Sequence, residues 1–105
     1  MIYLTEMIDV APDDLDTLLA GFEEHYLPGA LDRGMEFVAC WHTPVNIGED
    51  VTVTIIFGLP GWAEWETMRN AAVGDPAMPK WVELRRSVMR TGRRIFSEPA
   101  PFSPR

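Results

Sequence analysis

The chain has 105 residues, 47% of them hydrophobic and 24% charged, which is enough material for one core in a single domain spanning residues 1–105. The formal net charge of −7 argues against nucleic acid and anionic membranes as partners, because both attract clustered Lys and Arg. The chain starts without the basic and apolar regions of a secretory signal and has no stretch long enough to span a membrane, so we expect a cytoplasmic protein.

The charge is unevenly distributed along the chain. Residues 1–50 contain eleven acids and one base, whereas residues 51–105 contain five acids and eight bases. Parts of opposite sign can attract each other within one chain or across a homodimer, although solvated faces are the simpler interpretation. The single cysteine, Cys40, excludes an internal disulfide and a multi-cysteine metal site, and its place in an expected strand indicates a buried thiol.

The first strand is predicted over Ile2–Ile8, where Ile2, Leu4 and Ile8 flank Glu6 on one face. A helix then opens at Pro12, because proline suits the first helical position and the acids after it suit the positive end of the helix dipole. Its apolar stripe consists of Leu15, Leu18, Leu19, Phe22 and Tyr26. Pro28 is expected to kink or end this helix, and Gly34 to close the segment.

The second strand is predicted over residues 36–43 and is stopped by Pro44. Alternation places Phe37, Ala39, Trp41 and Thr43 on one face and Val38, Cys40 and His42 on the other. Residues 45–50 have the polar and glycine content of a hairpin loop, which would make the next strand antiparallel to this one.

Residues 51–57 are all β-branched or aromatic, which predicts the central strand of a sheet. One face carries Val51, Val53, Ile55 and Phe57, and the other is mixed. Burying each of these apolar side chains contributes about 1.5–3 kcal/mol, so an apolar partner must cover that face.

A second helix follows the break at residues 58–61, since Trp62, Trp65, Met68 and Ala72 repeat at helical spacing. Residues 74–76 interrupt it, and a further helical stripe of Trp81, Leu84 and Val88 runs from about Pro79 to an exit at Gly92. A short last strand is predicted over residues 93–98, before an extended, proline-stiffened tail over residues 99–104.

This order, β-α-β-β-α-β, predicts an α+β, ferredoxin-like fold with an antiparallel sheet. Both helices would cover one face of the sheet and leave the other free for a second copy of the chain. We expect a homodimer through that sheet face, on the argument that the apolar side of the central strand needs a cover.

Several short motifs resemble the NIPSNAP family over essentially the whole chain: the start at residues 1–4, Tyr26-Leu27-Pro28 followed by Gly34, a strand reaching Trp41, the tryptophan helix, Asp75-Pro76 before Trp81, and the ending at residues 98–104. The resemblance implies a dimeric α/β barrel, in which two ferredoxin-like chains press their sheets together, with a pocket between the helices and the sheet. Relatives in that wider superfamily include cofactor-free oxygenases acting on polyphenols, haem-degrading enzymes and polyketide cyclases, so the resemblance implies a scaffold and a pocket but no substrate.

Three residues are candidates for catalysis in such a pocket. His25 could act as a general base and Tyr26 could hold a developing oxyanion, as the histidine and tyrosine of the similar cyclases imply. The alternative is that Tyr26 belongs to the core while His25 faces solvent, because adjacent helical residues diverge by about 100°. His42 and Trp41 lie on opposite faces of their strand, so only one of them can face the cleft.

Candidate substrate-binding residues are aromatic or basic. An aromatic pocket could be walled by Trp62 and Trp65 with Phe22 and Phe57, although such a stripe is more often core. Trp41 is a further candidate for substrate binding. Arg93, like Arg69 and Arg94, could clamp a carboxylate or enolate, or simply face solvent. A metal site could in principle be built from His25, His42 and Glu6 or Glu36, but these residues do not have the i, i+3 or i, i+4 spacing of metal ligands. We therefore predict no metal and no cofactor.

Two functions fit the sequence. The first is a small cofactor-independent enzyme acting on a hydrophobic, aromatic or polyketide-like molecule by histidine-assisted proton transfer. The second is a non-catalytic dimeric binding or assembly module, which predicts a cleft filled by Tyr26, Trp62 and Trp65 with no inward histidine. An open cavity with a histidine inside it would favour the enzyme.

Overall fold

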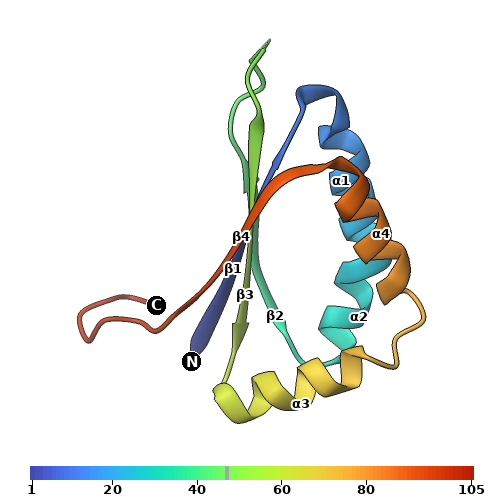
Figure 1. Cartoon of the computed structure of the whole chain (residues 1–105). Helices are drawn as coiled ribbons and strands as arrows, with labels where there is room; N and C mark the ends of the chain where they lie inside the picture. The colour runs from blue at the N-terminus through green and yellow to red at the C-terminus, as the bar shows by residue number, and fades with distance from the viewer. Residues whose placement is uncertain (47) are drawn as a thin grey trace.

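Four antiparallel strands form one sheet in the order β2-β3-β1-β4, in a computed structural model that describes residues 1–46 and 48–105. The strands are β1 (Ile2–Val10), β2 (Glu36–His42), β3 (Val51–Leu59) and β4 (Met89–Ser97). Between them lie two helical segments, one after β1 and one after β3 (Figure 1). The predicted β-α-β-β-α-β order and ferredoxin-like α+β fold are confirmed.

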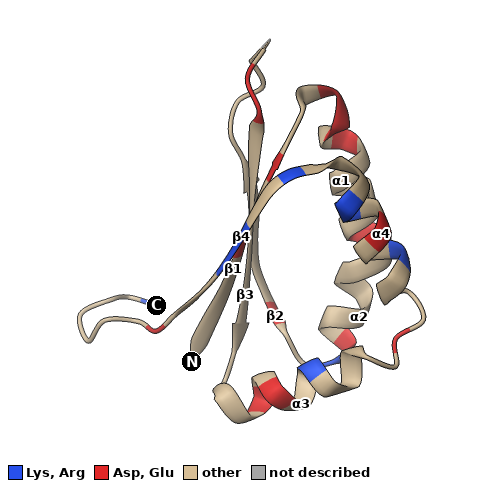
Figure 2. Cartoon of the chain, in the orientation of Figure 1, with Lys and Arg blue, Asp and Glu red and all other residues tan. Residues whose placement is uncertain are grey.

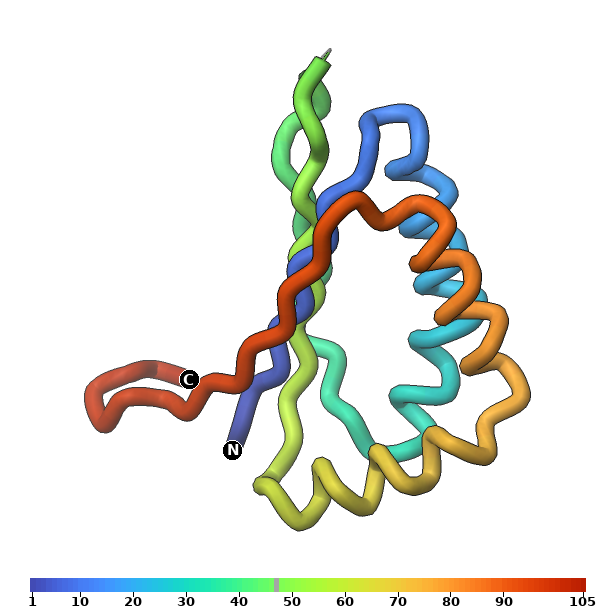
Figure 3. The backbone as a smooth tube through the Cα atoms, in the orientation of Figure 1, coloured from blue at the N-terminus to red at the C-terminus, as the bar shows by residue number. Residues whose placement is uncertain are grey.

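The helices all lie on one side of the sheet, as the backbone traces in Figures 1 and 3 show. The first segment is a single rod made of a 3₁₀ turn (Pro12–Asp14), α1 (Leu15–Gly21), a π-helical turn (Phe22–Tyr26) and α2 (Leu27–Asp32). The second contains α3 (Trp62–Ala72) and α4 (Met78–Val88), separated by the predicted break around Gly74. No helix in the described part of the chain is both long and apolar enough to cross a membrane.

The π-helical turn explains how the first rod continues past Pro28. Proline has no backbone N–H and its ring crowds the preceding turn, so a regular α-helix is strained at this point. The structure widens the turn just before it, where the Leu27 N–H donates to the Phe22 carbonyl, and Pro28 then lies in the first turn of α2. The predicted end or kink is therefore replaced by a local π turn that carries Phe22 and Tyr26.

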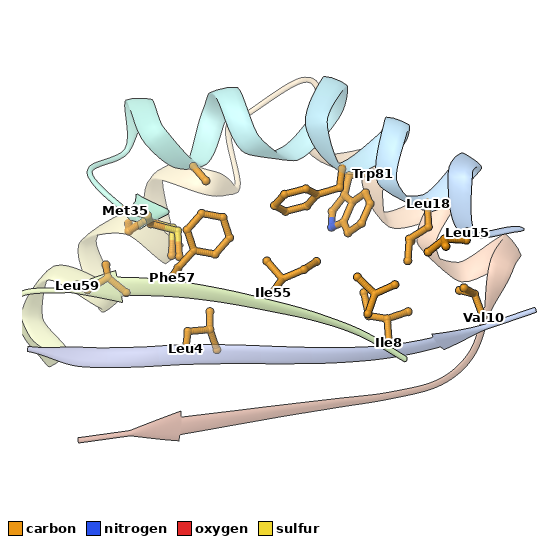
Figure 4. Packing of buried hydrophobic residues seen from close by; sticks show 14 of the residues in the cluster. Leu4, Ile8, Val10, Leu15, Leu18, Met35, Ile55, Phe57, Leu59 and Trp81 are labelled. Atoms are coloured by element: carbon orange, nitrogen blue, oxygen red, sulfur yellow. The ribbon is translucent and has the colours of Figure 1, made fainter. Parts of the chain in front are cut away.

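The core lies between the sheet and the helices. Alternate residues of β1 and β3 point toward α1 and α4, and Figure 4 shows Leu18 and Trp81 reaching down to meet Ile8 and Ile55. The apolar side of β3 is therefore covered by the chain's own helices, with Val53 fully buried. The argument that this apolar side demands a second copy of the chain is wrong, because the side left open is the mixed one.

A bulge in β2 changes which of its residues share a face. The register shifts between Phe37 and Ala39, so Phe37 lies opposite Phe57 on the helix side, whereas Trp41 lies opposite Thr54 on the outer side. The prediction that Phe37 shares the face of Ala39 and Trp41 is wrong for this reason, since one extra residue reverses the alternation. Phe37 instead packs against Phe22, with 5.9 Å between the ring centroids.

Pairing with β1 sets the lengths of its neighbours. β4 begins at Met89, directly after α4, so Gly92 lies inside the strand and does not mark the helix exit as predicted. β3 likewise continues through Gly58, which pairs with Tyr3, and an added Cβ there would lie 3.0 Å from the Met1 methyl group. Both extensions add ladder hydrogen bonds that periodicity alone does not count.

Two segments remain to be described, the loop between β2 and β3 and the C-terminal tail. The loop predicted over residues 45–50 includes Ile47, which lies outside the described residues, and the strands on either side of it are antiparallel as expected. After Ser97 the tail leaves the sheet on the side away from the helices (Figure 1). It is not fully extended, since the Ser103 N–H donates to the Ala100 carbonyl at 2.9 Å.

Candidate functional site

Glu6 places a carboxylate at the centre of the apolar face of β1, between Leu4 and Ile8. Its side chain is only 13% exposed. Arg94 of β4 donates to Glu6 Oε1 from Nη2 at 2.6 Å and from Nε at 3.0 Å, and Arg85 of α4 donates to the same oxygen from Nη1 at 3.3 Å. A charge at such a position requires partners, and the two arginines provide them.

Tyr26 comes from the π-helical turn and stands beside this cluster. Its ring lies 5.7 Å from those of Phe57 and Trp81, measured between centroids. Burial raises the pKa of the Tyr26 phenol, and the nearby Glu6 charge adds to the increase while Arg94, Arg33 and Arg85 oppose it. The phenol therefore stays protonated at neutral pH and can donate a hydrogen bond.

A cavity of 150 Å³ lies between the sheet, α3 and α4. Aromatic walls come from Tyr26, Trp65 and Trp81, and the polar side is formed by Glu6, Arg85 and Arg94; Met68, Arg69, Ala72, Met78 and Val82 complete the lining. Benzene fills an apolar cavity of about this size, whereas pockets for larger ligands run to about 300–1,000 Å³. The cavity thus accommodates about one aromatic ring.

A second pocket of 280 Å³ adjoins it at the β4 edge and is also lined by Glu6, Arg85 and Arg94. The three charged side chains therefore form a partition between the two spaces. Basic residues gather on α4 and β4 around this region, whereas the start of α1 is acidic (Figure 2).

One wall of the cavity is held by an aromatic cluster at the β4 edge. Trp65 meets Phe96 edge-on at 5.0 Å between centroids, and the Arg94 guanidinium lies 5.9 Å from the Trp65 ring. Trp62 also packs on Phe96, with 5.1 Å between the ring centroids, and donates from Nε1 to Glu98 at 3.3 Å. Trp65 therefore lines the cavity, whereas Trp62 supports it from outside and is 51% exposed.

The structure places both histidines away from Tyr26's cavity. His25 lines a separate surface pocket of 470 Å³ beside Arg33 and Asp75, with its Nε2 3.9 Å from Glu24. His42 is exposed at the end of β2, where its Nδ1 lies 2.8 Å from the Thr43 carbonyl oxygen. The catalytic roles of His25 and His42 stay predictions.

The remaining predicted residues are dispersed. Phe22 is a core residue, 4% exposed, that stacks on Tyr26. Trp41 is 61% exposed on the outer face of the sheet. Arg93 lies opposite Met7 on that outer side and lines the pocket adjoining the cavity. Of the residues named from the sequence as catalytic or substrate-binding, Tyr26, Trp65, Arg69 and Arg94 line the 150 Å³ cavity.

Sequence reasoning missed the cluster of Glu6 with Arg85 and Arg94. It considered Arg94 as a clamp and Glu6 as a metal ligand, but did not pair them. The available signal was a carboxylate flanked by Leu4 and Ile8 on a face that has to be buried. Among the described residues, no group of three or more His, Cys, Asp or Glu side chains is arranged to hold a metal ion.

Sequence comparison identifies the family. The model of the NIPSNAP family matches residues 6–104. No curated protein matches the chain.

Comparison with solved structures agrees on the fold. A NIPSNAP domain protein from Burkholderia xenovorans is similar with a TM-score of 0.80 at 13% identity, covering 100% of both chains. A NIPSNAP family protein from Agrobacterium tumefaciens has a TM-score of 0.75 at 12% identity, covering 98% of this chain and 96% of that one. A putative antibiotic biosynthesis monooxygenase from Nitrosomonas europaea has a TM-score of 0.70 at 6% identity, covering 94% and 98%.

Proposed function

The chain belongs to the NIPSNAP family, and we propose that it binds a small aromatic molecule in the cavity beneath α3 and α4, where Tyr26 stabilises a developing oxyanion. The observation that carries this proposal is the combination of three aromatic walls with a protonated phenol and a charged cluster around one partly open cavity. Such a mixture of apolar lining and few polar groups is characteristic of small-molecule sites.

The chemistry follows from the Tyr26 phenol. A neutral, largely buried hydroxyl can donate a hydrogen bond to negative charge that develops on a substrate oxygen, for example in an enolate. The solved relative from Nitrosomonas europaea, described as a putative antibiotic biosynthesis monooxygenase, supports an organic small molecule as the ligand class. Histidine-assisted proton transfer stays a prediction, because neither His25 nor His42 is among the residues that line this cavity.

A homodimer through the outer face of the sheet is part of this proposal. The face presents Trp41, 61% exposed, on the edge strand β2, with the half-buried Ile56 on the neighbouring β3 and the half-buried Ile95 on the opposite edge strand β4. Exposed and half-buried apolar side chains on one sheet face favour a protein partner. We place this dimer in the cytoplasm, as the sequence analysis expects.

The cavity is tested with p-cresol, a neutral one-ring probe, by following indole N–H signals in ¹H–¹⁵N NMR spectra. The signals of Trp65 and Trp81 should shift on addition of p-cresol, while those of Trp41 and Trp62 serve as internal controls. Ala72→Phe should abolish the shifts, since Ala72 lines the cavity and a phenyl group there fills it. His25→Ala and His42→Ala should leave them unchanged. Unshifted Trp65 and Trp81 signals in the wild-type protein would contradict the proposal.

The placement of the histidines favours a second candidate, a non-catalytic binding or assembly module. That candidate also predicts a cleft filled by Tyr26, Trp62 and Trp65, whereas the structure has an open cavity and Trp62 outside it. Solvent exchange separates the two, because an enzyme that stabilises enolates should speed deuterium uptake at the carbon next to a bound ketone's carbonyl. A module would bind phenylacetone without accelerating its deuterium uptake, so the uptake rate would be the same with Tyr26→Phe as with the wild-type protein. An enzyme would accelerate the uptake, and Tyr26→Phe would slow it.

A further inference from the structure

The walls of the 150 Å³ cavity carry more positive than negative charge. Arg69, Arg85 and Arg94 line it, against the single carboxylate of Glu6 among the described residues that do so. This surplus stands out in a chain whose net charge is −7. Charges in a partly buried site are screened much less than charges on the surface, so the surplus acts on any ligand that enters.

We infer that the cavity recognises an organic carboxylate carried on an aromatic ring, held by Arg94 and Arg85 while the ring lies between Tyr26, Trp65 and Trp81. This inference rests on the proposed function and names the class of its ligand. The supporting observation is that the guanidinium groups of Arg85 and Arg94 both donate to one oxygen atom of Glu6.

Both arginines converge on Oε1 of Glu6, and Oε2 accepts no hydrogen bond from the described residues. Arg94 directs both Nε and Nη2 at this one oxygen, although such a planar fork matches the two oxygens of a whole carboxylate. Arg85 contributes one bond of 3.3 Å, which is longer than the usual range of about 2.7–3.2 Å. Oε1 of Glu6 therefore accepts from two guanidinium groups that together have enough donors to bind the carboxylate of a ligand as well.

The surroundings position these donors toward a ligand. The Arg94 guanidinium lies 5.9 Å from the Trp65 ring, so the side chain that would bind the carboxylate touches the wall that would hold the ring. Glu6 keeps the arginines in place when the cavity is empty. A ligand carboxylate at the partition would take up the unused donors, and the ring would occupy the aromatic side of the cavity.

The test compares phenylacetate with phenylacetamide, two probes of nearly the same shape that differ in charge. Affinities are measured at pH 7 from the Trp65 and Trp81 indole shifts. The wild-type protein should bind phenylacetate about ten-fold or more tightly than phenylacetamide, which corresponds to about 1.4 kcal/mol. Glu6→Gln should raise the affinity for phenylacetate more than the affinity for phenylacetamide, because it removes the competing carboxylate.

Charge-matched variants separate a specific site from general electrostatics. Arg85→Gln with Arg94→Gln should abolish the preference for phenylacetate, whereas Arg86→Gln should keep it, since Arg86 neighbours Arg85 but does not line the cavity. Far-UV circular dichroism confirms that each variant is folded. If the double variant unfolds, Glu6→Gln decides alone.

The outcomes distinguish this inference from the proposed function. Equal affinity for the two probes in the wild-type protein would overturn the carboxylate and leave the aromatic cavity standing. A preference that survives in the folded double variant, or phenylacetate affinity that does not rise in Glu6→Gln, would overturn the assignment to this cluster. Indole signals that move with neither probe nor with p-cresol would overturn the proposed function itself.

Discussion

Two arginine–carboxylate sites lie under the helices of this protein, and they are built differently. In the first, Glu6 serves Arg85 and Arg94 with a single oxygen beside an open cavity. In the second, Arg33 donates from Nη1 to Asp75 Oδ2 at 2.6 Å, while Oδ1 of Asp75 accepts the Ala77 N–H at 2.8 Å. The first site leaves Oε2 of Glu6 without a hydrogen bond from the described residues, whereas the second uses both carboxylate oxygens to fix the turn between α3 and α4. In the second site, Nε and Nη2 of Arg33 are buried without a partner among the described residues.

The difference separates the proposed ligand site from a structural clamp. The Arg33 side chain is 9% exposed and that of Asp75 is 16% exposed, and Gly29 packs so closely on both that a Cβ there would collide with the carboxylate. A molecule bound between the two groups would have to displace the ion pair, although both residues also line the 470 Å³ surface pocket that contains His25. Arg85 and Arg94 are 30% and 49% exposed, so their charge can be offered to a ligand at small cost to the fold.

The largest expected effect is on stability at the clamp. Arg33→Met removes the partner of a largely buried carboxylate and should lower the melting temperature by about 10 °C, on a scale of about 4–8 °C per kcal/mol for a domain of this size. Arg85→Gln should change it by about 2 °C or less. Thermal unfolding followed by circular dichroism measures both. Equal losses for the two variants would erase the distinction between clamp and ligand site.

A smaller loss is expected from Gly29→Ala. The new methyl group would meet the Asp75 carboxylate and lie 2.7 Å from Nη1 of Arg33, which forces the ion pair to shift. Crowding of this kind typically costs about 1–3 kcal/mol. Urea denaturation reports the free energy of unfolding. Gly74→Ala is the matched control, because its added Cβ would have only ordinary contact, 3.8 Å from the Ala71 carbonyl oxygen. A free energy of unfolding in Gly29→Ala equal to that of the wild-type protein would mean that the Arg33–Asp75 ion pair can be displaced without loss of stability.

Acid should weaken the clamp. The hydrogen bond from the Ala77 N–H, and next the one from Arg33, hold the pKa of Asp75 below its ordinary value. A carboxyl group with a lowered pKa in the folded state stabilises the fold fully above its unfolded pKa of about 3.9, and that contribution is lost as the pH falls below it. Asp75→Asn should therefore flatten the fall in stability below about pH 4. The urea midpoint is measured at pH 3 and pH 6 for both proteins. A drop in midpoint between pH 6 and pH 3 that is equally large in Asp75→Asn and in the wild-type protein would contradict this prediction.

The smallest effect on the fold should come from the outer face of the sheet. Trp41→Lys replaces an exposed indole opposite Thr54, so the melting temperature of the isolated chain should hardly change. Its self-association should fall, because the proposed interface loses its largest apolar side chain. Sedimentation equilibrium at micromolar concentration compares the two proteins. A wild-type chain that is monomeric there would remove the dimer from the proposal.

The sequence predicted the fold well because the fold follows from local periodicity. Seven consecutive β-branched or aromatic residues marked β3, and tryptophans at helical spacing marked α3. The bulge at Val38 and the continuation of β4 through Gly92 depend on hydrogen bonding to neighbouring strands, which periodicity does not contain. The prediction therefore failed on faces and boundaries and held for element order.

The candidate site was less predictable for a related reason. Glu6 and Arg94 are 88 residues apart in sequence and meet only because β1 and β4 pair with those two residues opposite each other. Tyr26 was found because it lies on an apolar stripe, and its direction was set by a π-helical turn that no residue pattern announced. A carboxylate on a strand face that has to be buried was the one local sign of the site.

The central claim is that the space between the sheet and helices α3 and α4 binds a small aromatic molecule. A crystal structure of the protein grown with 4-bromophenylacetate tests it directly, because bromine gives an anomalous signal that locates the ring. The account predicts an anomalous peak between Tyr26, Trp65 and Trp81. Crystals whose bromine peaks all lie elsewhere, or which show none at saturating ligand, would contradict it.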